Sequence, residues 1–301
     1  MHMQGCSSAP PTSGALTCAV EEAGFTACAG PHKPYRPTMG TATNDDYLAM
    51  FMEEFDPPPK DQAGSDPKIN ENKDLVCCRL DCLLRLRKIA LVIGPERVCK
   101  ELLPYLENLL KENDEQPSPE ALGDEVLTQL AQELGNYAPL VGEGQAYKLL
   151  NCLIMLCHVD ETTVRGDAIK AIKGLIKKKH LSPQQVFQHL APSVLALSRD
   201  KTDKGQEWFD CLVRVSACEL IAVAYEGCKA AATGTGKPTV KAIPSFGSEP
   251  KEMTAEDMMD ALLNVFRFCI NGTEGRAEEL MVKRAAAKEI GEVAQAVCDA
   301  A

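Results

Sequence analysis

The sequence has few aromatic residues, no excess of basic residues and no long hydrophobic run. Aromatic side chains make up 5% of its 301 residues, with a single tryptophan, so aliphatic residues, alanine and cysteine must fill most of the core. Lysine and arginine number 32 against 43 acidic residues, a formal net charge of −11. Such a charge argues against nucleic acid as a partner. No stretch reaches the length of a transmembrane helix, so we expect no membrane partner either.

The chain has fourteen cysteines, but no two of them form a C-x-x-C pair. The usual zinc sites need such a pair, so we expect no metal and no cofactor. Several of the cysteines lie among aliphatic residues at helical spacing, where a free thiol packs as a small hydrophobic group. This usage favours a reducing compartment, which predicts a cytoplasmic and possibly also nuclear protein.

A short pattern recurs five times along the chain. An apolar residue is usually followed by a cation, then by a small or apolar residue three positions on and an aliphatic residue four beyond that. The copies lie at residues 78–86, 126–134, 164–172, 213–221 and 282–290. Their second positions, called here the cation positions, are Arg79, Leu127, Arg165, Arg214 and Lys283. Successive copies are 38 to 69 residues apart, a spacing typical of two-helix repeats of the HEAT or armadillo kind.

These repeats predict an all-α protein, an α-solenoid or superhelix of about five HEAT helical hairpins with no strand. Residues 1–43 are rich in Pro, Gly and Ser without periodicity, so we expect a disordered N-terminal tail before a HEAT-repeat domain at 44–301. The repeats are expected at about 45–94, 95–142, 143–180, 181–229 and 253–301, with a mobile insertion at 229–253. Because the last repeat lacks a neighbour, we expect its face near Ile290, Val293 and Val297 to be apolar and exposed.

We find no set of residues in the sequence that predicts catalysis. The five histidines are not followed by glutamate, so the His-Glu pairs that hold iron in oxygenases of this architecture are missing. The glycine-rich stretch at 232–239 departs from a phosphate-binding loop at Ala231 and Pro238. We therefore expect no catalytic residues, and a binding surface rather than an enzyme.

Four segments resemble, in order and phasing, the scaffold or A subunit of protein phosphatase 2A. They lie at residues 78–110, 124–142, 159–172 and 282–297. The likeness covers about residues 45–298 of this chain and corresponds to the first five HEAT repeats of that subunit. It implies a non-catalytic scaffold and regulator of a serine/threonine phosphatase, with turns inside the repeats that hold an exchangeable regulatory (B-type) subunit. In that family the last repeats hold the catalytic subunit, so this chain would bind it only if further repeats exist elsewhere.

The resemblance also implies which residues bind protein. The matching turns lie around residues 115–125, 160–165, 208–214 and 274–284. The implied protein-binding residues are Glu125, Asp160, Glu161, Arg165, Trp208, Phe209, Arg214, Lys283 and Arg284. An exposed tryptophan often anchors an interface, although Trp208 could instead pack inward at the entrance of its helix.

The sequence leaves two alternatives open. The basic residues at the cation positions could form ladders between repeats, with acidic neighbours such as Asp167 or Glu219, in addition to or instead of binding a partner. The whole chain could also be a generic HEAT-repeat adaptor in transport or complex assembly. Such an adaptor would share the repeat pattern without binding phosphatase subunits.

Overall fold

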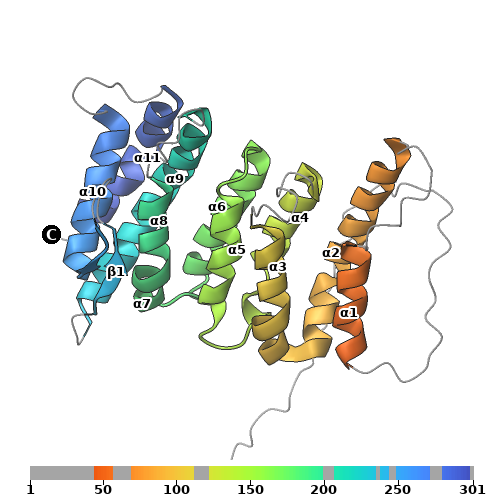
Figure 1. The fold of residues 1–301 in the computed structure, drawn as a ribbon. Coiled ribbons are helices and arrows are strands. Elements are labelled where there is room, and N and C mark those ends of the chain that lie inside the picture. The colour runs from red at the N-terminus through yellow and green to blue at the C-terminus, as the bar shows by residue number, and fades with distance from the viewer. Residues whose placement is uncertain are drawn as a thin grey trace, which may run out of the picture. The chain divides into compact units, whose positions relative to one another are not determined.

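A computed structural model describes residues 44–56, 69–111, 122–198, 207–234, 238–243, 249–271 and 280–298. All of these belong to one compact unit, Thr41–Ala301. The tail expected at residues 1–43 lies outside the described residues. In Figure 1 the helices form a row of neighbouring pairs that follows the chain from α1 and α2 at one end to α10 and α11 at the other. The fold is the predicted α-solenoid.

The first pair is formed by α1 (Asn44–Phe55) and α2 (Ile69–Arg97). The backbone breaks at Gly94, with φ 81° and ψ 165°, just before Pro95. Glycine tolerates this positive φ because it has no Cβ. The second pair is formed by a π-helical turn, η1 (Val98–Leu102), α3 (Leu103–Leu109) and α4 (Asp124–Leu134).

The remaining elements follow the predicted order with adjusted ends. The third pair comprises η3 (Ala138–Leu140), η4 (Ala146–Lys148), α5 (Leu149–Leu156) and α6 (Thr162–Lys177). The fourth comprises α7 (Pro183–Gln185), η5 (Val186–Leu190), α8 (Ala191–Leu197) and α9 (Glu207–Ala232). The fifth comprises α10 (Ala255–Asn271) and α11 (Leu280–Cys298).

The first helices of the second and fourth pairs carry the same local distortion. Pro104 and Pro192 each follow a five-residue π-helical turn, in which Leu103 N–H donates to the carbonyl of Val98 and Ala191 N–H donates to that of Val186. Proline has no N–H, so it cannot continue the normal i→i−4 ladder, and the wider turn accommodates the missing bond. Both prolines are thus tolerated inside long helical segments.

The insertion before the fifth pair contains strands that the sequence analysis did not predict. β1 (Val240–Ala242) and β2 (Lys251–Met253) pair antiparallel, with Val240 opposite Met253 and Ala242 opposite Lys251. Ala242 and Met253 are buried, so one face of this ribbon packs against the helices. The expectation of no strand was wrong at this ribbon.

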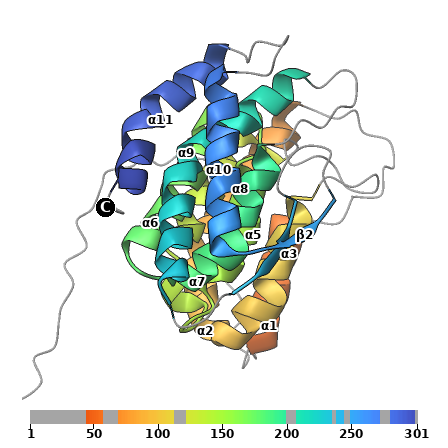
Figure 2. The ribbon, with the colours of Figure 1, turned by 90° about the vertical axis from the view of Figure 1, so that its left-hand side faces the viewer.

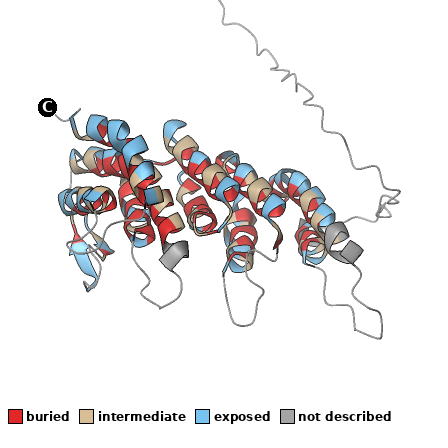
Figure 3. Ribbon diagram, turned by 90° about the horizontal axis from the view of Figure 1, so that it is seen from above, coloured by how far each residue is buried: buried red, intermediate tan, exposed pale blue. Residues whose placement is uncertain are grey.

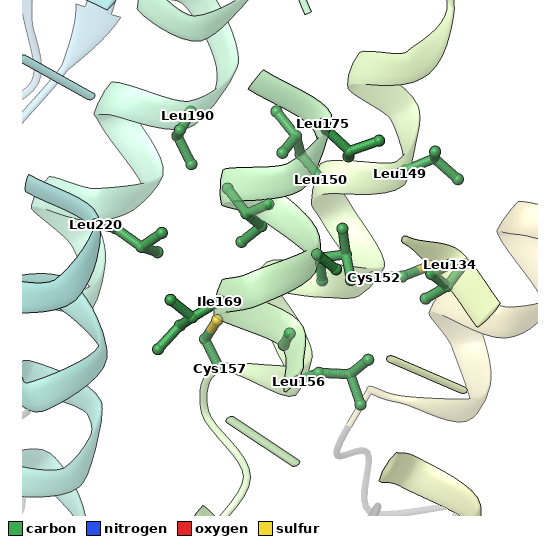
Figure 4. Packing of buried hydrophobic residues seen from close by; sticks show 14 of the residues in the cluster. Leu134, Leu149, Leu150, Cys152, Leu156, Cys157, Ile169, Leu175, Leu190 and Leu220 are labelled. Carbon is green, nitrogen blue, oxygen red and sulfur yellow. The ribbon is translucent and has the colours of Figure 1, made fainter. Parts of the chain in front are cut away.

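Buried residues line the sides on which neighbouring helices meet (Figure 3). In the third pair, Cys152 on α5 and Ile169 on α6 pack into a core that Leu134 of α4 bounds on one side and Leu220 of α9 on the other (Figure 4). Each pair thus buries its apolar residues against the pairs before and after it. This shared core explains why a single pair would not be stable alone.

The face expected to be open at the last repeat is exposed only in part. Ile290 is 53% exposed, as predicted, but Val293 is 4% exposed and Val297 is half-buried. Val293 is covered because α11 packs against α9 and α10 on that side. The prediction therefore holds for Ile290 and was wrong for Val293.

Candidate protein-binding surface

The turn inside the third repeat, residues 157–161, is the one intra-repeat turn that the described part of the chain contains in full. The turns of the other four repeats include residues 57–68, 112–121, 199–206 and 272–279, which lie outside that part. Glu161, the last residue of the turn in the third repeat, caps α6. Its carboxylate accepts from Thr163 N–H at 3.2 Å and from Thr163 Oγ1 at 2.8 Å. These bonds, the Oγ1 bond foremost, lower the pKa of Glu161. This turn is therefore a negatively charged helix N-terminus, with Asp160 exposed beside it.

Arg165 lies beneath this turn and braces it. Its side chain is 4% exposed, and Nη1 donates to the carbonyl oxygens of Val159 at 2.8 Å and Asp160 at 2.5 Å. Nη2 also donates to Thr162 Oγ1 at 3.3 Å. Burial lowers the pKa of Arg165, and the nearby charge of Asp160 opposes that shift. The guanidinium thus holds turn carbonyls that have no helical partner, and the structure gives it no exposed face for a partner.

The first repeat uses its cation position in the same way. Arg79 is 7% exposed and its Nε donates to the carbonyl of Phe55 at 3.0 Å, at the C-terminal end of α1. Its guanidinium also lies 5.8 Å from the Phe55 ring centroid and 3.8 Å from Asp56 Oδ1. In the first repeat the arginine of the second helix binds the end of the first helix, and in the third repeat it binds the turn that follows the first helix. Arginine suits this role because its planar group offers several donors at once.

The other cation positions vary in burial. Arg214 is 4% exposed, with Nη2 3.3 Å from Cys211 Sγ. Lys283 is half-buried, and Leu127 is fully buried. Four of the five positions are buried and four carry a cation, so a charge at this position does not bring the side chain to the surface. We infer that its shared role is structural.

The remaining predicted residues fall into two groups. Glu125 lies exposed in the first turn of α4, where a carboxylate favours the positive end of the helix dipole, and Arg284 is exposed on α11. Trp208 and Phe209 belong to the first turn of α9, but their side chains lie outside the described residues. Within the described residues, the structure therefore brings together Asp160, Glu161 and Arg165 at one turn.

Bonds between repeats do exist, and two of those among the described residues use acidic side chains that the sequence analysis named. Asp167 accepts from Gln132 of the preceding repeat at 2.7 Å and from Lys170 at 2.8 Å. Glu219 pairs with Lys288 of the following repeat at 3.3 Å. Asp167 and Glu219 are the acidic residues that the sequence analysis named. Their partners here are Gln132, Lys170 and Lys288, each of which lies five residues after a cation position.

Sequence reasoning missed an exposed aliphatic ridge on α2. Leu84 is 60% exposed and Leu91 is 65% exposed. Leu84 lies five residues after its cation position. The matching residues of the later repeats are Gln132, Lys170, Glu219 and Lys288. The signal was available, because aligning the five copies shows a leucine where all the others are polar.

The described residues contain no group of three or more His, Cys, Asp or Glu side chains placed to hold a metal ion. Among the described helices, none is both long and apolar enough to cross a membrane. A shallow groove between α4 and α6 is lined by polar side chains and two glycines. Its lining residues include Gln132, Gly135, Asn136, Asp167, Lys170 and Gly174.

Comparison with known proteins gives no matching family model but several related sequences. The chain is 38% identical over 157 residues to the alpha isoform of the 65 kDa regulatory A subunit of serine/threonine-protein phosphatase 2A from Arabidopsis thaliana, covering 52% of this chain and 23% of that protein. It is 33% identical over 225 residues to a probable phosphatase PP2A regulatory subunit of Caenorhabditis elegans, covering 74% and 29%. It is 31% identical over 211 residues to the protein phosphatase 2A scaffold subunit of Dictyostelium discoideum, covering 65% and 32%.

These matches agree with the order of the repeats and with the helical architecture. The chain spans less than a third of the length of each of these three relatives. The match nevertheless extends over up to 225 residues, or 74% of this chain, which is much longer than one repeat. The chain belongs to the family of regulatory A subunits of protein phosphatase 2A, the HEAT-repeat scaffold proteins.

Proposed function

We propose that this protein is a non-catalytic scaffold for a serine/threonine phosphatase of the 2A type. In this proposal the intra-repeat turns bind a regulatory subunit of the B type. Family membership supports the proposal, since the relatives are named as scaffold or regulatory subunits. The observation that carries it is the third turn, whose backbone is held from inside by Arg165 while Asp160 faces solvent.

A turn held in this way suits protein binding. Ordering a mobile loop on binding costs free energy, and a loop held in place beforehand avoids much of that cost. Asp160 is exposed and Glu161 beside it is half-buried, so the turn presents an acidic surface that fits a basic patch on the partner. Arg165 acts here as a positioning residue, while Asp160 and Glu161 are placed to make the contact.

The test reverses the charge at the contact and keeps the backbone carbonyls that Arg165 holds, while it removes a negative charge near the Arg165 guanidinium. Asp160→Arg reverses an exposed charge, and the bond from Arg165 goes to the Asp160 backbone carbonyl, which the substitution retains. The matched control is Glu143→Arg. Glu143 is equally an exposed acidic residue, but lies in the link between the second and third repeats, at the opposite ends of the helices.

Capture of purified B-type regulatory subunits is measured for the wild type and both variants. We expect Asp160→Arg to weaken capture about tenfold or more, since like charges then meet across the interface, and Glu143→Arg to leave it unchanged. Circular dichroism should be the same for all three. Wild-type protein that captures no phosphatase regulatory subunit would refute the proposed function and favour a generic adaptor. Equal capture by all three proteins would refute only the role of this turn.

A further inference from the structure

The end of α6 has a backbone conformation that is unusual for its residue. Lys179, just after the helix, has φ 60°, and it is the one residue other than glycine with a positive φ in the described part of the chain. Its N–H donates to the carbonyl of Ile176, and the next N–H, of His180, donates to that of Leu175, both at 2.9 Å. Glycine usually ends a helix in this way, because a Cβ is strained at positive φ. The lysine is therefore kept against a cost in stability, which points to a use for its side chain.

Lys179 belongs to a basic cluster. Lys177 and Lys178 precede it, and all three side chains are exposed; the three residues are here called the lysine cluster. The helix dipole favours cations at this end of α6. No ion pair joins the cluster to another described residue, whereas Lys170, earlier on the same helix, pairs with Asp167 at 2.8 Å. In a chain of net charge −11, the cluster is a local surface of opposite sign, and it attracts negatively charged groups.

The groove between α4 and α6 leads to the lysine cluster. Lys178 lines one end of this groove and Asp167 lines the other. At about 1.5 Å of rise per helical residue, these two positions are about 16 Å apart along α6, which is the length of about five residues of extended chain. The floor is low at Gly174, where an added Cβ would meet nothing within 4 Å. An extended peptide can therefore lie in the groove with its backbone close to the helices.

The sides of the groove carry groups that can bind a peptide backbone. Gln132 and Asn136 are exposed along its α4 side. Gln132 donates to Asp167 at 2.7 Å, and Asn136 donates to the Gln132 carbonyl at 3.1 Å. Each side-chain amide keeps a further donor and an acceptor for a ligand. Asp167 is the one acidic residue among the described residues that line the groove, and Lys170 offsets its charge.

We propose that the groove and the lysine cluster bind an acidic, extended segment of a partner protein. The carboxylates of that segment bind the lysine cluster, and its backbone lies along the side-chain amides of α4. In Figure 2 the second helices α6, α9 and α11 lie to the left of the first helices α5, α8 and α10. The lining residues come from α4 and α6, both second helices. The groove therefore opens on the side of the row that the second helices form.

This inference goes beyond the proposed function and does not depend on it. The turn at residues 157–161 precedes α6, whereas the lysine cluster follows it, so the two surfaces lie at opposite ends of one helix. Their charges are also opposite, since Asp160 is exposed at the turn and three lysines are exposed at the other end. A basic patch fits the first surface and an acidic segment fits the second. Either surface can bind its partner without the other.

Fluorescence polarisation of the full chain with a labelled oligoglutamate peptide tests the proposal. A peptide of about six residues roughly matches the length of the groove. We expect saturable binding with a dissociation constant of roughly 10–100 µM at low salt. The affinity should fall several-fold at about 0.3 M salt, because salt screens exposed charges. A glycine-serine peptide of the same length should not bind. Absence of saturable oligoglutamate binding at low salt would overturn the proposal.

Substitutions in the lysine cluster separate binding from stability. Lys179→Gly removes both the charge and the strained Cβ, so it should raise the midpoint of urea unfolding while it weakens peptide binding about threefold or more. Lys178→Glu should weaken binding about tenfold or more. Lys88→Glu is the matched control, because Lys88 is also an exposed helical lysine but lies on α2. Equal weakening by Lys88→Glu and Lys178→Glu would reveal a general effect of net charge and overturn the assignment to the groove.

A further pair of variants tests the groove itself. Gly174→Gln places a side chain on the floor of the groove, and glutamine favours helix over glycine, so the fold should be at least as stable as the wild type. Peptide binding should still weaken, because the new side chain occupies the place of the peptide. Gly291→Gln on α11 is the control, since an added Cβ there also meets nothing within 4 Å, and it should bind like the wild type. Binding that Lys178→Glu, Lys179→Gly and Gly174→Gln all leave intact would also overturn the proposal.

Discussion

Replacing Arg165 by leucine tests whether the cation position braces the turn or binds the partner. The substitution removes the donors that hold the carbonyls of Val159 and Asp160 at 2.8 and 2.5 Å. A hydrogen bond from a charged donor contributes about 1.5–3 kcal/mol. Two such bonds would give about 3–6 kcal/mol, but leucine also relieves the cost of burying a guanidinium. Leucine fits the position, since Leu127 occupies it fully buried in the second repeat.

The net loss from Arg165→Leu should therefore be about 2–3 kcal/mol of unfolding free energy, most of it local to the third repeat. Urea unfolding followed by circular dichroism measures the loss. Amide hydrogen exchange at the start of α6 shows where it occurs. Arg165→Lys should give an intermediate result, because an ammonium lacks the planar set of donors. Arg284→Leu, at an exposed site on α11, should change stability by less than about 0.5 kcal/mol.

Regulatory-subunit capture completes this test. If Arg165 braces the turn, Arg165→Leu weakens capture in parallel with the loss of protection in α6, whereas Asp160→Arg weakens capture with a much smaller loss of protection, because it keeps both bonds to the turn carbonyls. Arg165→Leu that abolishes capture while unfolding and exchange stay unchanged would refute the brace. The buried side chain would then have to reach the partner directly.

The remaining predictions concern packing, thiol reactivity and the cap of α6. Gly227→Ala should destabilise the fourth repeat by about 1–3 kcal/mol in urea unfolding, because the new Cβ would lie 2.2 Å from Val186 Cγ1. Gly174→Ala is the control, since nothing lies within 4 Å of a Cβ there. It should raise the unfolding free energy by about 0.5–1 kcal/mol, because alanine favours helix over glycine. Maleimide labelling at pH 8, read out by mass spectrometry, should modify the exposed Cys77 and Cys78 but spare Cys157 and Cys228. Burial raises the pKa of both buried thiols to about 12. Labelling of Cys157 in folded protein would contradict this prediction. The pKa of Glu161 is lowered from 4.5, so its cap stabilises α6 above that pH and is lost as the pH falls through the lowered pKa. Hydrogen-exchange protection factors at the start of α6 should therefore drop in acid for the wild type. In Glu161→Gln they should be low and should not change with pH.

The sequence predicted the helices well where periodicity and capping agree. Ser182 followed by Pro183 is a sequence typical of a helix start, and the structure shows a reciprocal capping box of Ser182 with Gln185. Threonine is a favoured residue just before a helix, and at the start of the fifth repeat Asp257 N–H donates to Thr254 Oγ1 at 3.2 Å. Both signals are local, because the residues that form the bonds lie within one turn of each other.

The misses share a different physical cause, which is that burial depends on distant neighbours. An arginine at the start of an amphipathic helix has the same pattern whether it faces a partner or the inside of a turn, so the burial of Arg165 was not visible in the sequence. The strands β1 and β2 are three residues long, too short for an alternating pattern. Their pairing depends on segments about ten residues apart. Val293 is buried because α11 packs on α9 and α10, which periodicity alone does not specify.

The repeat pattern itself says little about function, since the residues that define it are the buried ones. Positions that obey the pattern in every copy stack one repeat on the next, as Leu86 and Ile221 do at 0% exposure. Information about partners lies in the copies that break it. Leu84, for example, is 60% exposed and apolar at a position where the other repeats are polar. A chain of similar units therefore distinguishes its binding surfaces through these exceptions, which become visible only when equivalent positions are compared in three dimensions.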